Sequence, residues 1–168
     1  MCITRWLGAA LADGVMLHRR IDSFTEMHAA FRRSRSRVSE GRRRYGGIMV
    51  DMFYDHFLAV HWQRYSPEPL ADFTAETYRL IAARLDALPA PFAPVFARMA
   101  AHDWLGSYRD TANVALALDR MALHRARQPN PLAGAGEELL AAYPGFEADF
   151  LDFFPDALGF AEQVRRGR

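Results

Sequence analysis

Apolar residues occupy almost every position from Ile48 to Trp62, and the rest of the chain is organised around this run. A helix that is apolar around most of its circumference is buried rather than half exposed. The polar exceptions within the run are Asp51, Asp55, His56 and His61. We therefore predict a buried central helix that carries a few ionisable side chains.

Helical patterns and helix-boundary signals continue on both sides of the central run. Before it, we predict a helix from Asp13 that breaks near Phe24, where Ser23 and Glu26 have the spacing of a capping box, and a second helix through His28 to about Arg37. After it, helices are expected over residues 70–88, from 94 toward 101, over 111–127, 132–142 and 146–154, and from 155 onward. Because no useful stretch alternates as a strand would, we predict an all-α fold of seven to nine helices in a single domain over residues 1–168.

Two carboxylates on the central helix are the first candidates for chemistry. Asp51 and Asp55 are four residues apart, so they project from one face, and His56 lies about 100° further around the helix. His18 and Asp22 form a second pair with the same spacing on the preceding helix. Helices joined by a short connection tend to pack together, so the two pairs can converge. A mixed set of carboxylates and imidazoles suits Mn²⁺, Mg²⁺ or Fe²⁺ better than a structural zinc.

A structural explanation of the same residues stays open. Buried Asp and His side chains also pair with arginines or cap helices, and pairs of acids four residues apart are common. Arg19 and Arg20 could hold a phosphate group or be solvated. Asp110, beside Arg109, could be a helix cap or a late metal ligand. The remaining histidines are interpreted as structural. His61 is either one of them or a residue that hydrogen-bonds to a metal ligand without binding the metal itself.

Charge is distributed unevenly along the chain, whose overall net charge is only +1. Residues 32–44 carry a net charge of +6, whereas the remainder carries −5. The chain has no lysine, which excludes Schiff-base chemistry, and its single cysteine excludes an internal disulfide. No run of apolar residues is long enough to span a membrane, and the first residues lack the form of a signal peptide, so we expect a cytoplasmic protein.

Three blocks of the sequence resemble the acyl carrier protein phosphodiesterases, also called ACP hydrolases. They are G-V-x-L-H-R-R-I-D-x-F-T at 14–25, S-R-x-R at 34–37 and R-Y-x-G-I-x-V-D-x-F-Y-D-H-F-L-A-x-H-W at 44–62. A later W-L-x-x-Y-R-D at 104–110 also matches, and the resemblance covers residues from about 14 to 158. Members normally begin with a segment like N-[FY]-L-A-H-L-x-L-A and a G-[DN]-x-x-x-D-F element, and residues 1–13 contain neither.

The resemblance implies a divergent relative of the HD-domain metal phosphohydrolases. It implies hydrolysis of the phosphodiester between 4′-phosphopantetheine and a serine of acyl carrier protein, with Mn²⁺, or Mg²⁺, Fe²⁺ or Co²⁺, as cofactor. The implied catalytic residues are Asp51, Asp55 and His56, and the implied metal ligands are His18, Asp22, Asp51, Asp55 and His56. Phosphate or substrate would be bound by Arg19, Arg20 and Arg109. The acidic carrier protein would dock on Arg32, Arg33, Arg35, Arg37, Arg42, Arg43 and Arg44.

Other functions remain open at this stage. An HD-like enzyme could instead hydrolyse a small phosphoester or nucleotide, in which case the arginine-rich segment would be incidental. A degenerate member could bind a carrier protein or another polyanion without cleaving it. Nucleic acid is not expected as a partner because no recognisable nucleic-acid-binding motif is present.

Overall fold

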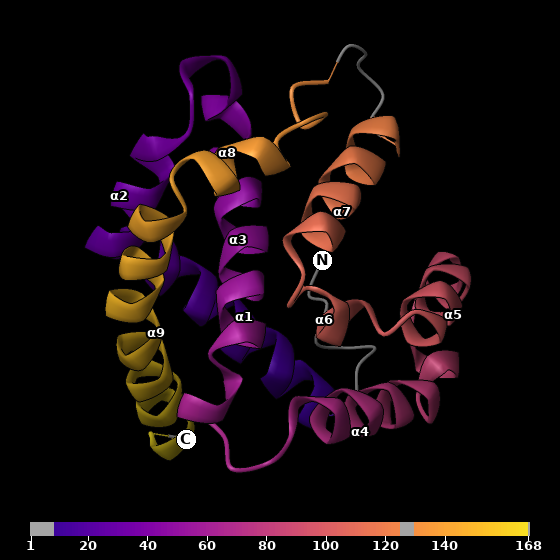
Figure 1. Ribbon diagram of the computed structural model, residues 1–168. Helices are drawn as coiled ribbons and strands as arrows, with labels where there is room; N and C mark the ends of the chain where they lie inside the picture. The colour runs from indigo at the N-terminus through magenta and orange to yellow at the C-terminus, as the bar shows by residue number, and fades with distance from the viewer. Residues whose placement is uncertain (1–8, 125–129, 168) are drawn as a thin grey trace.

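The computed structural model describes residues 9–124 and 130–167, and within these ranges it contains helices and no strand (Figure 1). The all-α prediction is therefore confirmed. The α-helices are α1 (Ala9–Met27), α2 (Ala29–Arg37), α3 (Gly46–Val60), α4 (Leu70–Ala82), α5 (Ala93–Ala101), α6 (Trp104–Ser107), α7 (Thr111–His124), α8 (Gly136–Ala141) and α9 (Tyr143–Arg166). Short 3₁₀ helices connect some of them: η2 (Glu40–Tyr45), η3 (Trp62–Arg64), η4 (Leu85–Ala87) and η5 (Ala90–Phe92).

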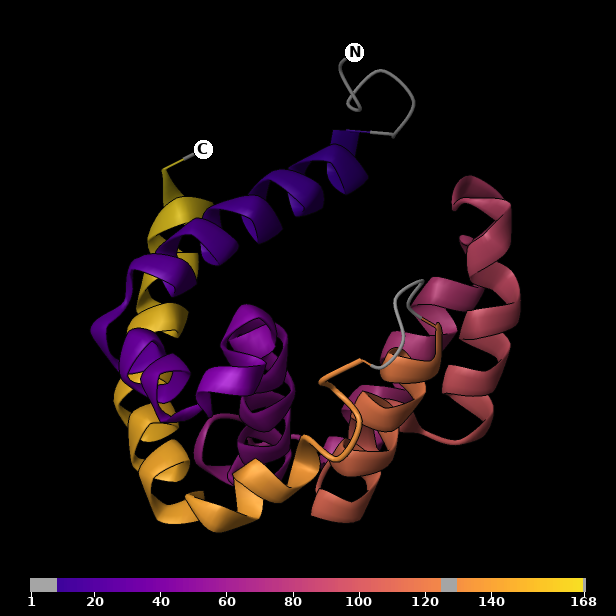
Figure 2. The ribbon, with the colours of Figure 1, turned by 90° about the horizontal axis from the view of Figure 1, so that it is seen from above.

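The predicted central helix is α3, and it lies in the middle of the molecule. Helices α2 and α9 pack against one side of it and α7 against another, as the view from above shows (Figure 2). Its side chains at Met49, Val50, Phe53 and Phe57 are completely buried. They form one core with buried residues of α2, α7, α8 and α9. Burial on nearly all sides explains why the segment is apolar around its circumference.

The boundary between α1 and α2 differs from the sequence prediction. The chain stays helical through Ser23, whose hydroxyl donates to the carbonyl of Arg19 at 3.0 Å and so does not cap a new helix. Helix α2 begins after His28, whose Nδ1 accepts a hydrogen bond from the Ala30 amide at 3.2 Å. The capping-box prediction was wrong because a hydroxyl inside a helix can bond back to the preceding turn.

Helix α9 also differs from the prediction of two helices separated at Pro155. It is continuous over 24 residues, with Pro155 inside it. Aromatic side chains of this helix belong to the core, with Phe146, Phe150 and Phe153 buried. Their packing against α2 and α3 holds the helix together across the proline.

Smaller differences affect the other helix ends. Helix α4 stops at Ala82 rather than near residue 88, and α8 is shorter than predicted. The start of α7 is capped by Asp110, whose Oδ1 accepts from the Ala112 amide at 2.9 Å, which is the structural one of the two roles considered for it. The predicted end of this helix, near residue 127, lies outside the described residues.

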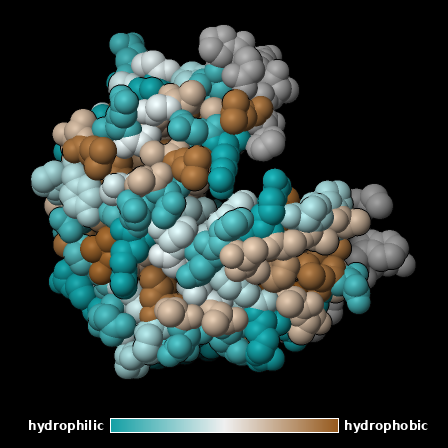
Figure 3. Space-filling model, turned by 45° about the vertical axis from the view of Figure 1, so that its right-hand side comes forward, coloured by the Kyte–Doolittle hydropathy of each residue, from teal (hydrophilic) through white to brown (hydrophobic). Residues whose placement is uncertain are grey.

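The surface carries hydrophobic side chains in small groups. On the face drawn in Figure 3 they are spread between polar residues, and a deep notch hollows the upper right of that face. None of the described helices has both the length and the apolar character needed to cross a bilayer.

Candidate functional site

Four carboxylates of α1 and α3 are linked through their charges, and we call them the acidic cluster: Asp22 and Glu26 from α1, which both act on Asp51, and Asp51 and Asp55 from α3. The side chain of Glu26 reaches the first turn of α3, since a Cβ placed on Gly47 would lie 3.8 Å from its Oε1. Each pair is four residues apart, so each helix presents its two carboxylates on one face. Glu26 was not predicted as part of the site, although its position one turn after Asp22 places it on the same face.

The electrostatics of the cluster are those of crowded anions. Burial raises the pKa of Asp51 from 3.8 to about 6, with further contributions from Glu26 and Asp22 and an opposing one from Arg35. Burial, and then the charge of Asp51, raises the pKa of Asp55 to about 7. Both side chains nevertheless keep exposed surface. They are therefore open to water on one side and surrounded by protein on the others, and solvent moderates these effects.

The predicted pair on α1 forms as expected. Nε2 of His18 lies 3.5 Å from Oδ2 of Asp22, and both side chains are exposed. The charge of Asp22 contributes to the raised pKa of Asp51, so the two predicted pairs are near enough to interact electrostatically. The pair leaves His18 on the side of α1 that carries the cluster.

His56 lies on a different side of α3 from Asp55 and is 2% exposed. Its Nδ1 is 2.8 Å from the carbonyl oxygen of Tyr108, which can only accept, so Nδ1 carries the proton and donates. Its Nε2 then accepts from the hydroxyl of Tyr143 at 2.9 Å. Burial lowers the pKa of His56, which favours the neutral ring. Both ring nitrogens are thus engaged, and His56 joins α3 to the end of α6 and to α9.

Tyr108 connects His56 to the acidic cluster. While its carbonyl is held by His56, the pKa of its phenol is raised by burial and by the charge of Asp55. The neutral phenol therefore lies in the electrostatic field of Asp55. His56 acts in this arrangement through the backbone that positions Tyr108.

The three arginines predicted to hold phosphate do not converge. Arg19 is exposed on α1, and Arg20 lines a groove between α1 and α9. Arg109 lies beside His56 and Asp110 and donates through Nε to the carbonyl of Ala59 at 3.3 Å. Of the three, only Arg19 lies three residues from Asp22, which places it next to the acidic cluster on the helix surface.

Most arginines of the basic segment are used inside the protein. Arg33 and Arg37 both donate through Nε to the buried carboxylate of Asp149, at 2.8 and 2.9 Å. The hydroxyl of Ser34 donates to the same carboxylate at 3.0 Å and lies 3.0 Å from the hydroxyl of Tyr54. We call Asp149, Arg33, Arg37, Ser34 and Tyr54 the Asp149 hub. The sequence signal for it, an aspartate within the apolar stripe of α9, was missed.

Two further arginines of that segment form ion pairs. Nη1 of Arg35 lies 2.6 Å from Oε2 of Glu26, and Nη1 of Arg42 lies 3.0 Å from Oε1 of Glu138. Arg32, Arg43 and Arg44 have no ion-pair partner within residues 9–124 and 130–167. The segment therefore does not present seven free cations to a partner.

The predicted metal ligands are not gathered around one point. Among the described residues, no group of three or more His, Cys, Asp and Glu side chains is arranged to hold an ion. The donors of the acidic cluster are of the kind that a divalent cation prefers, because they are carboxylate oxygens, and Arg35 offsets part of their negative charge by pairing with Glu26. A metal at this cluster remains a prediction.

Comparisons with known proteins point to one family. A family model described as acyl carrier protein phosphodiesterase matches residues 3–157. An acyl carrier protein phosphodiesterase of Klebsiella pneumoniae is 32% identical over 155 residues, which span 92% of this chain and 80% of the relative. The proteins of the same name from Serratia proteamaculans and an Enterobacter species are 32% and 30% identical over 150 and 146 residues, or 89% and 86% of this chain and 77% and 75% of theirs. No solved structure is significantly similar.

Proposed function

Because the chain belongs to the acyl carrier protein phosphodiesterase family, we propose that it hydrolyses the phosphodiester between 4′-phosphopantetheine and a serine of acyl carrier protein. Water would add to phosphorus, the bond from phosphorus to the serine oxygen would break, and the serine oxygen would take up a proton. The products are the apo-carrier protein and free 4′-phosphopantetheine. The observation that supports this reaction best is the acidic cluster, with two carboxylates of raised pKa that water can reach.

Asp55 is the group best suited to receive a proton from water. Its pKa of about 7 keeps a large fraction deprotonated at neutral pH while making the carboxylate a stronger base than an ordinary aspartate. Asp51, one turn away, maintains that raised proton affinity through its charge. The phenol of Tyr108, close enough to sense Asp55, could donate to a phosphoryl oxygen. Arg19 could neutralise charge on the phosphate from the exposed side of Asp22.

A divalent cation, Mn²⁺ in our proposal, would be held by Asp22, Asp51 and Asp55 with His18 beside them. When bound, such an ion neutralises phosphate charge and makes bound water more acidic. His56 is not part of this set, because both its nitrogens are hydrogen-bonded to Tyr108 and Tyr143. It would serve as a positioning residue for Tyr108.

The test is mass spectrometry of holo-acyl carrier protein incubated with the chain and Mn²⁺. We expect loss of the phosphopantetheine mass, which chelator abolishes and which Asp55→Asn reduces by at least about a hundredfold, the range typical of removing a general base. Asp86→Asn is the matched control, since it removes one exposed carboxylate on η4, away from the cluster. An intact carrier protein with the wild-type chain would refute the proposal. Turnover of a small phosphodiester together with an untouched carrier protein would favour the small-substrate alternative.

A further inference from the structure

Helix α1 carries two chemically different surfaces. At about 100° per residue, Asp22 and Glu26 share one side of the helix, from which both act on the charge of Asp51 and Glu26 reaches Gly47 of α3. The neighbouring side of the same helix carries Arg19, Ser23 and Arg20, which are all exposed. Met16 and Met27 share that side and are 43% and 75% exposed. We call these five residues the α1 ridge.

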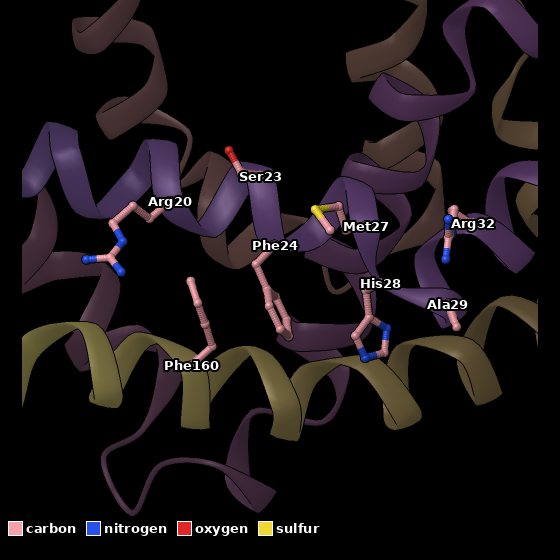
Figure 4. A pocket seen from close by; sticks show the side chains of 8 residues that line it. All are labelled: Arg20, Ser23, Phe24, Met27, His28, Ala29, Arg32 and Phe160. Carbon is pink, nitrogen blue, oxygen red and sulfur yellow. The ribbon is translucent and has the colours of Figure 1, made fainter.

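A groove of about 600 Å³ lies where the α1 ridge meets α9. Phe24 stacks on Phe160 of α9 at a ring-centroid distance of 4.6 Å and forms its apolar floor. In Figure 4, Arg20 and Arg32 stand at opposite ends of the groove, with the two phenylalanines between them. An apolar floor between two cations is complementary to an amphipathic segment that carries acidic residues around apolar ones.

The cations of the α1 ridge and of this groove are available to a partner. Arg19, Arg20 and Arg32 have no ion-pair partner among the residues that the structure describes, in contrast to the arginines bound to Asp149, Glu26 and Glu138. The described residues that line the groove include no carboxylate, and Asp156, which lies 3.2 Å from Nε2 of the lining residue His28, is already paired with it. The groove therefore keeps a net positive charge.

The proposed reaction places a strict condition on where its substrate docks. The bond to be cleaved joins phosphorus directly to a serine of the carrier protein, so the body of the carrier protein must lie against the surface next to the catalytic carboxylates. Helix α1 meets this condition because the ridge and the acidic cluster lie on adjacent sides of one helix about 10 Å in diameter. The free cations of η2, Arg43 and Arg44, are on a different element.

We propose that the α1 ridge and its groove dock the acidic surface of the carrier protein, with Arg20 and Arg32 as the cationic ends and Met27 as an apolar contact. This inference rests on the proposed function, since it names the surface by which that substrate is held. It replaces the predicted seven-arginine docking surface with Arg19, Arg20 and Arg32. Binding through these cations weakens as salt screens them.

The test is the affinity of the chain for apo-carrier protein, measured by fluorescence anisotropy at low salt so that no cleavage intervenes. We expect the double variant Arg20→Glu/Arg32→Glu to weaken binding by about tenfold or more, because it puts like charges against the carrier protein. Arg64→Glu/Arg98→Glu changes charge equally at exposed arginines of η3 and α5 and should bind like wild type. Met27→Asp should weaken binding without altering any arginine.

Three outcomes overturn the inference. They are unchanged binding by Arg20→Glu/Arg32→Glu, an equal loss in the Arg64→Glu/Arg98→Glu control, and a larger loss in Arg43→Glu/Arg44→Glu. Circular dichroism checks that each variant folds, and the arginines have no described ion pair to lose. Failure of this inference is distinct from failure of the proposed function. A wild-type chain that cleaves holo-carrier protein while the ridge variant binds normally refutes only the docking surface, whereas specific ridge-dependent binding without cleavage refutes only the reaction.

Discussion

Asp55 gives the sharpest test of the acidic cluster, because its raised pKa is also a cost to stability. The folded protein holds the proton of Asp55 more tightly than the unfolded chain does, with a pKa of about 7 against an ordinary 3.8. The unfolded chain therefore loses this proton first as pH rises. The free energy of unfolding should fall between about pH 4 and pH 7 and stay low above pH 7. Asp55→Asn removes the charge and with it this loss.

The size of the effect follows from the pKa and from the exposure of the side chain. The change from 3.8 to about 7 corresponds to roughly 4 kcal/mol, at 1.36 kcal/mol for each tenfold change in proton affinity. Because Asp55 keeps exposed surface, solvent screens much of this penalty, and we expect about 1–2 kcal/mol. At pH 8 without divalent cations, Asp55→Asn should therefore be more stable than wild type by that amount. Near pH 4 the difference should vanish.

Urea unfolding at several pH values in the presence of chelator measures this difference. Asp86→Asn is again the control, and it should change stability by less than about 0.5 kcal/mol at every pH, as surface substitutions usually do. If Asp55→Asn is less stable than wild type at pH 8, or if its advantage does not depend on pH, the description of the cluster as crowded anions is wrong.

Three further predictions follow from the same contacts. Mn²⁺ at a hundred times its dissociation constant should stabilise the wild type by about 2.7 kcal/mol in thermal unfolding and leave the stability of Asp55→Asn unchanged. Equal stabilisation of both proteins would show that any bound ion lies away from the acidic cluster. Asp149→Asn should lower the free energy of unfolding by about 3 kcal/mol, which is the low end for a broken buried ion pair because the arginines bound to Asp149 are partly exposed. The control Asp152→Asn, which removes an exposed ion pair, should lower it by less than about 1 kcal/mol. Similar losses from both variants would contradict a special role for the Asp149 hub. Burial lowers the pKa of His56, so the free energy of unfolding should decrease as pH falls below about 6.5 and the unfolded chain binds this proton first. His56→Phe should make the free energy of unfolding depend less on pH in this range, even though the variant is less stable at pH 7. An unchanged pH dependence in acid unfolding curves would show that His56 does not cause it.

The pattern of apolar residues was sufficient to predict the helical fold and its central helix. The boundaries failed where local signals are ambiguous. Ser23 donates a hydrogen bond to its own helix instead of capping a new one. Pro155 is tolerated within α9 because packing against other helices compensates for the stability lost with its missing backbone hydrogen bond. Neither outcome can be deduced from the neighbouring residues alone, because contacts with other helices decide them.

The candidate site was predictable where it depends on spacing within a helix. The pairs formed by His18 with Asp22 and by Asp51 with Asp55 follow directly from the four-residue repeat. The orientation of His56 does not, since its hydrogen-bond partner Tyr143 is 87 residues away. Nor does the pairing of the arginines, because Asp149 is more than a hundred residues from the arginines that it binds.

The proline inside α9 has a consequence for local unfolding. Pro155 has no amide hydrogen, so the carbonyl of Leu151 lacks its helical partner and the turns on either side are coupled less strongly. The large core residues Phe146, Phe150 and Phe153 come before the proline, whereas the turns after it bury only the smaller Ala157 and Val164 and carry Phe160, which stacks on Phe24 of α1. Amide hydrogen exchange should therefore be slow before residue 155 and faster beyond it, with the last turns opening as a separate cooperative unit. A molecule that fills the groove above Phe160 would slow exchange in that unit first.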